Sequence, residues 1–168
     1  MSLEERIASM DRRLSQILSG IIVDPHLTKY LARPKNPYFY RTQFLPLTAS
    51  LTLTAEFTIE SGYDFLCLGA NAVVTDTSDA VIASVASTFV PFNPPFLVTI
   101  RNSGSSQQLM SNGIAFANIF GTGADPYYWP IPKVFTARTV VQTTLENLSA
   151  TDRRVRIAYF GFHTDIPS

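Results

Sequence analysis

The stretch from Leu51 to Glu60 alternates apolar and polar residues at every step, and this period of two restricts the fold more than any other feature. Successive side chains of a β-strand point to opposite faces, so the pattern predicts a half-buried strand. The side chains expected to point inward are Leu51, Leu53, Ala55, Phe57 and Ile59. Those expected to point outward are Thr52, Thr54, Glu56, Thr58 and Glu60. A sheet with one apolar face needs a second layer to cover that face.

More segments of this kind follow, separated by residues that form turns. Tyr63–Leu68 is apolar on both faces, which predicts a central strand. The other predicted strands are 80–90, Phe96–Arg101 and Gly113–Phe120, followed by a long loop over Gly121–Pro132. A closing hairpin is predicted from Thr139–Asn147 and Arg153–His163. Its expected inward side chains are Val141, Thr143, Leu145, Val155, Ile157 and Tyr159.

Seven or eight short strands with no convincing helix after residue 24 predict a mainly β fold, an antiparallel β-sandwich, over residues 38–168. Long proline-rich crossings such as Pro91–Pro95 favour a jelly roll over a meander of tight hairpins. The chain of 168 residues is long enough for one domain with a short appendage.

The appendage is an N-terminal segment, residues 1–23, with apolar residues spaced alternately four and three apart. This is the a/d stripe of a coiled coil, and it predicts a short α-helix that acts in oligomerisation or anchoring. The predicted interface residues are Leu3, Ile7, Met10, Leu14, Ile17 and Ile21. A helix of this length is marginal alone in water, so it needs another surface. The mixture of Ile, Leu and Met at these positions favours a coiled coil of three helices over one of two.

Residues 24–37 contain three prolines and no periodicity, which predicts an extended arm between the helix and the sandwich. At about 3.1 Å per residue such an arm could reach roughly 40 Å. The helix and the sandwich could therefore contact different subunits, and we expect the arm to be held against a neighbouring surface.

Residues suited to catalysis or metal binding are few. His163 and Asp165 are a closely spaced His/Asp combination, but no Gly-x-Ser-x-Gly motif accompanies them, and an ordinary strand-end histidine is the favoured interpretation. Cys67 lies between two leucines and is interpreted as a buried, inert thiol. Glu56 and Glu60 are interpreted as members of a polar row. These patterns predict no enzyme activity, no metal and no cofactor.

Charge and hydropathy limit the partners. Thirteen basic and thirteen acidic residues cancel, and only 15% of residues are charged, against about 25% in an average soluble protein. No cluster of Lys and Arg suits a phosphate backbone, so nucleic acid is not an expected partner. No apolar run is long enough for a transmembrane helix, so no membrane partner is expected either. Low charge with many aromatic residues indicates apolar surface that other proteins cover.

Two aromatic clusters have functional promise. They consist of Tyr38, Phe39 and Tyr40, and of Tyr127, Tyr128 and Trp129. Tyrosine and tryptophan often anchor subunit contacts, which is the favoured interpretation in a chain with a heptad segment and an arm. The alternative is a stacking platform for sugar rings.

Several segments together resemble small virion proteins of tailed bacteriophages. In such proteins a proline-rich approach leads into a strand, an Asn-Leu-Ser type of turn follows, and a final strand ends near glycine and an aromatic residue or histidine. The segments that carry the resemblance are Tyr127–Thr139, Val140–Ser149, Arg153–His163 and the opening stretch Tyr38–Thr54. The resemblance depends on the residue pattern of the strands and on the order of the turns between them. It implies a non-enzymatic jelly-roll component of a phage particle.

The function predicted from this resemblance is that of a capsid decoration (cement) protein, assembled in the host cytoplasm and located in the virion. Its partners would be further copies of itself, with a trimer favoured, and other virion proteins such as the major capsid protein. A neck or tail attachment protein is an alternative in the same class. A carbohydrate-binding module on a fibre, with Tyr127, Tyr128 and Trp129 as its platform, is the alternative from another class. A hydrolase would require His163 or the Glu56/Glu60 row in a deep pocket.

Overall fold

The computed structural model describes Tyr30 and residues 35–78, 95–103, 109–110, 112–121 and 126–166. Its elements are β1 (Lys35–Leu47), β2 (Thr52–Thr58), β3 (Tyr63–Thr75), β4 (Phe96–Asn102), β5 (Ile114–Ala115), the 3-10 helix η1 (Phe116–Asn118), β6 (Tyr127–Phe135), β7 (Val140–Asn147) and β8 (Arg153–Asp165). The predicted heptad helix and the predicted strand 80–90 lie outside the described residues. The first strand begins at Lys35, three residues before the predicted start of the sandwich.

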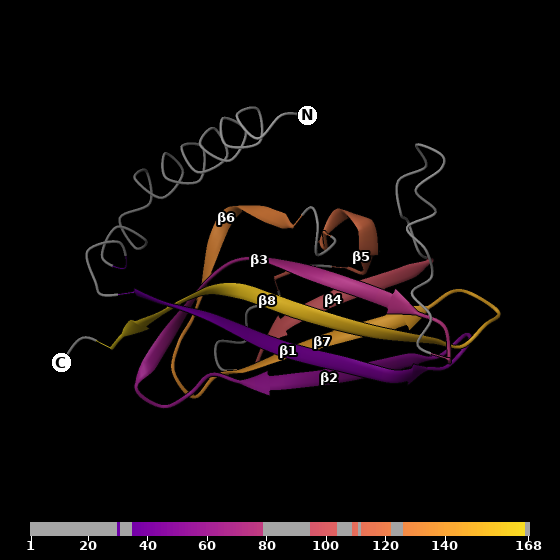
Figure 1. The fold of residues 1–168 in the computed structure, drawn as a ribbon, viewed down its shortest axis with the longest axis horizontal. Helices are drawn as coiled ribbons and strands as arrows, with labels where there is room; N and C mark the ends of the chain where they lie inside the picture. The colour runs from indigo at the N-terminus through magenta and orange to yellow at the C-terminus, as the bar shows by residue number, and fades with distance from the viewer. Residues whose placement is uncertain are drawn as a thin grey trace.

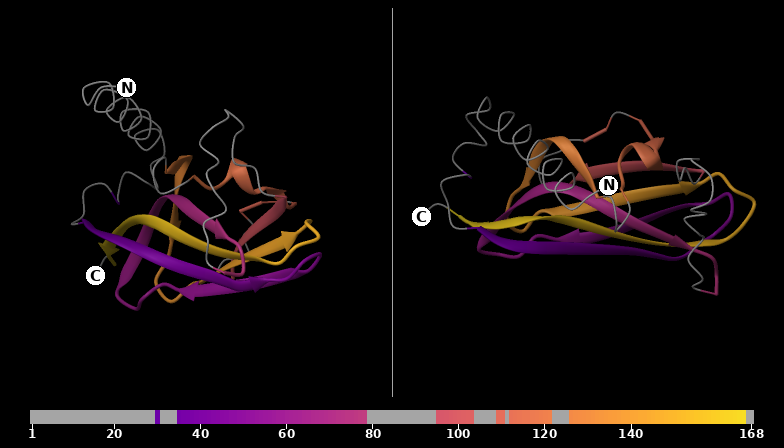
Figure 2. Two further views of the ribbon diagram at one scale, coloured as in Figure 1. Left: turned by 45° about the vertical axis from the view of Figure 1, so that its right-hand side comes forward. Right: turned by 45° about the horizontal axis from the view of Figure 1, so that its top comes forward.

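The strands form two antiparallel sheets of four strands each, in the orders β1-β8-β3-β6 and β2-β7-β4-β5 (Figure 1). The predicted antiparallel sandwich is confirmed, and so is the central position of the strand that begins at Tyr63. The pairing is nested: β1 pairs with β8, β2 with β7, β3 with β6 and β4 with β5. Figure 2 shows β1 and β8 running side by side in two further views.

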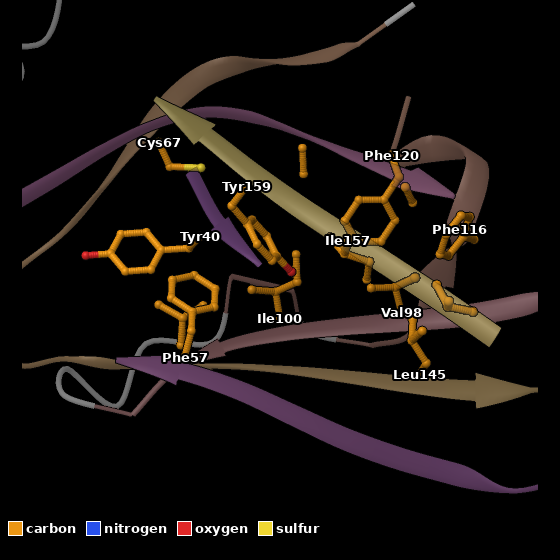
Figure 3. Packing of buried hydrophobic residues seen from close by; sticks show 14 of the residues in the cluster. Tyr40, Phe57, Cys67, Val98, Ile100, Phe116, Phe120, Leu145, Ile157 and Tyr159 are labelled. Carbon is orange, nitrogen blue, oxygen red and sulfur yellow. The ribbon is translucent and has the colours of Figure 1, made fainter. Parts of the chain in front are cut away.

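The core lies between the two sheets and is rich in aromatic rings. Tyr159 of β8 stands near its middle, with Tyr40 and Phe57 toward one end and Phe116 and Phe120 toward the other (Figure 3). The Tyr159 and Thr143 hydroxyls are hydrogen-bonded at 2.5 Å, which satisfies two buried polar groups. All six side chains predicted to face inward on the last two long strands are fully buried.

The predicted closing hairpin is wrong, because its two strands belong to different sheets. After β7 the chain crosses to β8, and the buried Asn147 side chain organises the crossing. Its amide nitrogen donates to the carbonyls of Leu47, Thr48 and Thr151 at 3.0–3.3 Å. Its amide oxygen accepts from the Ser149 backbone and hydroxyl at 2.9 and 2.6 Å. Because one side chain ties the end of β1 to the turn between β7 and β8, the turn can bend between layers.

Two other predictions need correction. The predicted strand over Gly113–Phe120 is only β5, two residues long, followed by η1. The predicted loop over Gly121–Pro132 contains the first part of β6, which is an edge strand, where prolines are tolerated. The pairing of β6 with β3 shifts register between Tyr128 and Lys133, which accommodates Pro130 and Pro132.

The alternation of Leu51–Glu60 is confirmed only in part. Phe57 and Ile59 are buried, and Phe57 stacks on Tyr40 with ring centroids 4.7 Å apart. Leu51 and Leu53, expected to point into the core, remain exposed, Leu51 by 51%. The pattern identified the strand and its face but not how far the opposite sheet covers that face.

Candidate functional site

The outer face of the β1-β8-β3-β6 sheet carries a row of large apolar side chains. Phe39 is paired with Phe160, and Phe160 and Tyr128 are both paired with Gly69 between them. Because Gly69 has no side chain, the Phe160 ring lies over it and meets Tyr128 edge-on, with centroids 5.1 Å apart. Phe39 ends the row and is 65% exposed.

A second apolar row runs beside the first. Leu66 of β3 is paired with Phe162 of β8 and with Val134 of β6, and Phe162 is paired with Pro37. Leu66 does not belong to the main core; it is buried in a separate cluster with Tyr30, against which Leu68 and Val134 pack. We call the surface formed by Phe39, Leu66, Tyr128, Phe160 and Phe162 the aromatic face.

The aromatic face has a sharp boundary along the strands. The next rows bring Arg41 opposite Ala158 and Gln43 opposite Arg156. Apolar side chains of this size are therefore concentrated at one end of the sheet, toward the start of β1. Tyr30, which is only 6% exposed, lies against Leu66 at this end.

A ring cluster lies where β1, β3 and β8 meet at the same end of the sandwich. The His163 imidazole is stacked between Tyr38, at 3.8 Å between centroids, and Tyr63, at 5.0 Å. Its Nε2 atom lies 2.9 Å from the Tyr40 hydroxyl, which also accepts a hydrogen bond from the Glu60 backbone at 3.2 Å. The hydroxyl hydrogen is then free to be donated to Nε2, which requires a neutral imidazole.

The electrostatics of the cluster agree with this assignment. Burial lowers the pKa of His163 below its ordinary value, and attraction by Glu60 opposes part of that shift. The Tyr38 hydroxyl donates to Glu60 at 2.7 Å, and this hydrogen bond is the main cause that raises the Tyr38 pKa. The cluster resembles a structural network more than a catalytic one, because each reactive group is already engaged by a neighbour.

An apolar groove opens on the side of the sandwich where β6 and β5 are the edge strands. It lies between β6 and the region of β4, β5 and η1. Its volume is about 300 Å³. The apolar residues that form most of it include Ile100, Ile119, Tyr127, Trp129, Pro130 and Ile131. The polar lining residues are Asn118 and Lys133. This composition suits an apolar guest with a small polar end.

The predicted aromatic clusters are each divided between faces. Tyr40 is buried in the core and Tyr38 stacks on His163, whereas Phe39 points outward. In the second cluster Trp129 is 8% exposed, and its Nε1–H donates to the Ile119 carbonyl at 3.4 Å. Tyr127 lines the groove and Tyr128 belongs to the aromatic face. The three rings of the second cluster therefore do not form one flat surface.

The other candidate residues have evident structural partners. Cys67 is fully buried, its thiol lies 3.4 Å from the Gly69 carbonyl, and burial raises its pKa. Glu56 accepts a hydrogen bond from Gln142 at 3.3 Å. Within the described ranges no three His, Cys, Asp or Glu side chains are grouped closely enough to hold a metal ion. No helix in the described part of the chain is long and apolar enough to cross a membrane.

No protein-family model matches the chain, and no curated protein matches it in sequence. The predicted interface residues Leu3, Ile7, Met10, Leu14, Ile17 and Ile21 lie outside the described residues. The sequence analysis did not place Leu66, Phe160 and Phe162 on the outer face of the sheet, where Leu66 and Phe160 are themselves buried. Two signals pointed to them: Tyr63–Leu68 is apolar on both faces, and the last strand contains the run Tyr159–Phe162. A strand apolar on both faces needs cover on both.

Proposed function

We propose that the protein is a non-enzymatic structural component of a bacteriophage particle, a capsid decoration protein that bridges neighbouring shell subunits. The observation that carries the proposal is the aromatic face. An exposed phenylalanine such as Phe39, continuous with a row of rings, is typical of a surface that a partner protein covers. A partner that buries one such ring gains about 1.5–3 kcal/mol.

The strand order supports assignment to the jelly-roll class. An eight-stranded antiparallel ribbon that is rolled into two sheets pairs its strands in a nested order. The described strands have this order: β1 pairs with β8, β2 with β7, β3 with β6 and β4 with β5. This is the topology that the resemblance to phage virion proteins implies. Sandwich folds serve many functions, so the particle role is argued from the aromatic face and not from the fold.

The arm and the heptad segment supply the second half of the proposed mechanism. Tyr30, which falls within the predicted arm, lies against Leu66 of the aromatic face, the surface proposed to meet a partner. The heptad segment, residues 1–23, would hold copies together, as a trimer or with another virion protein. Several copies on one shell then add avidity even where each contact is of modest area.

The test is binding to phage heads that lack the protein. Wild-type protein is expected to sediment with the heads of the phage that encodes it. Phe39→Ser should weaken that binding at least tenfold, because Phe39 is the most exposed ring of the aromatic face. Val73→Ser is the matched control, since Val73 is an exposed apolar residue on the same sheet but outside the aromatic face, and it should bind within twofold of wild type. Wild-type protein that fails to bind heads would contradict the proposal.

A further inference from the structure

The apolar groove between β6 and the region of β4, β5 and η1 is independent of the aromatic face. We propose that it binds a free medium-chain amphiphile with an anionic head, a fatty-acid carboxylate being the simplest, with the tail against Trp129 and the head at Lys133. The volume of about 300 Å³ lies at the lower end of the range for small-molecule pockets and suits a single acyl chain.

The lining explains the preference for an apolar tail. Ile119, Tyr127 and the ring of Trp129 present hydrocarbon to the groove, and Ile131 at its rim is 54% exposed. The indole N–H of Trp129 already donates to the Ile119 carbonyl, so this polar group makes no demand on a guest. A hydrocarbon chain would remove the exposed apolar surface from water without leaving a buried polar atom unpaired.

The preference for an anionic head comes from the charge at the groove. Among the described residues that line it, Lys133 alone is charged, and Asn118 offers an amide as a second polar group. Lys133 is exposed, so its ammonium group can meet a carboxylate at the mouth while the tail enters the groove. A cationic head would be repelled, and a neutral head would lose the charge-assisted contact.

An added peptide strand is disfavoured by the edge itself. Among the described strands, β6 beside the groove pairs on one edge only, and an open edge would normally invite β-strand addition. Pro130 and Pro132 have no backbone N–H and interrupt the ladder that an added strand would need. The groove is therefore better suited to a guest that needs no backbone hydrogen bonds.

Trp129 makes the proposal directly testable, because it is the only tryptophan in the chain. Titration of the full-length protein with decanoate, below its critical micelle concentration, should give a saturable change in tryptophan emission. Octanoate should bind roughly 15-fold more weakly, at about fourfold for each missing methylene. Decanol should bind more weakly than decanoate, and decyltrimethylammonium most weakly.

Two variants and a control decide the outcome. Ile131→Asp places a charge at the rim and should weaken decanoate binding more than tenfold. Lys133→Glu should reverse the order of decanoate and decyltrimethylammonium. Leu51→Asp, at an exposed leucine on β2's side of the molecule, should change neither. The proposal is overturned if decanoate gives no saturable change, or if the binding is indifferent to Ile131→Asp. It is also overturned if phosphatidylglycerol vesicles, and not free decanoate, produce the change. Because no phage head is involved, failure here leaves the particle assignment untouched.

Discussion

The outer faces of the two sheets have opposite chemistry although their inner faces share one core. On the β2-β7-β4-β5 sheet, Thr54, Thr144 and Thr99 form one outward row, since Thr144 is paired with both of the others. In the next row Gln142 stands between Glu56 and Arg101. The other sheet presents the aromatic face. One outer surface is therefore polar, whereas the other is apolar at the end where β1 begins.

The difference shows that the outward residues of a sandwich, and not its core, indicate where a partner protein binds. Inward residues must be apolar in any sandwich, so they indicate the fold and little else. Outward residues need not be apolar, and a row of phenylalanines there lowers the solubility of the protein unless another surface covers it. Tyr30 covers part of the face, over Leu66, whereas Phe39 stays open. The open part is what we assign to a partner.

The largest expected effect on this comparison comes from Gly69, which leaves room for the Phe160 ring on the aromatic face. A Cβ atom there would stand 2.1 Å from the Tyr127 carbonyl oxygen and 2.8 Å from the Phe160 ring. Gly69→Ala should lower the free energy of unfolding by about 3 kcal/mol, since the carbonyl belongs to a paired strand and cannot move aside. Urea denaturation measures the change.

Gly113→Ala is the matched control for Gly69→Ala. The three atoms nearest to its Cβ would be side-chain atoms of Leu97, the closest at 3.2 Å, so the loss should stay below about 1 kcal/mol. Equal losses for the two variants would mean that Gly69 is not required by the close approach of β6 and Phe160. The comparison of the two faces would then lose its clearest local cause.

The second effect concerns the ring cluster at the end of the aromatic-face sheet. Burial lowers the pKa of His163 in the folded protein below the value near 6.5 that it has in the unfolded chain. The unfolded chain therefore binds more protons as the pH falls below this value. The stabilisation by neutral His163 is complete above about pH 6.5 and is lost as the pH falls through the folded-state pKa.

His163→Phe should flatten this dependence between pH 7 and pH 5, because it keeps a ring between Tyr38 and Tyr63 but removes the titration. The measurement is the slope of unfolding free energy against pH. The absolute stability is less informative, since the Tyr40 hydroxyl loses its acceptor. An unchanged slope in the variant would show that other groups cause the acid sensitivity.

The sequence predicted the inner architecture better than the outer one, for a physical reason. Alternation identifies which residues share a face, so Val141, Thr143 and Leu145 were placed in the core correctly. It says nothing of which sheet a strand joins, and the β7–β8 hairpin was wrong because Asn147 bends the chain between sheets. The aromatic face depends on which residues of neighbouring strands are paired, such as Phe160 with Gly69. The pattern of a single strand does not identify these partners.

The smallest expected effect lies on the polar face. The hydroxyls of Thr54 and Thr144 are hydrogen-bonded at 2.8 Å across β2 and β7, exposed to water. A double-mutant cycle of Thr54→Val and Thr144→Val should give a coupling energy of about 0.2–1 kcal/mol, because water competes for the same hydroxyls. Either single variant should leave binding to phage heads within twofold of wild type. A tenfold loss of that binding would place a partner on the threonine row, and the contrast between a wet face and a covered one would have to be abandoned.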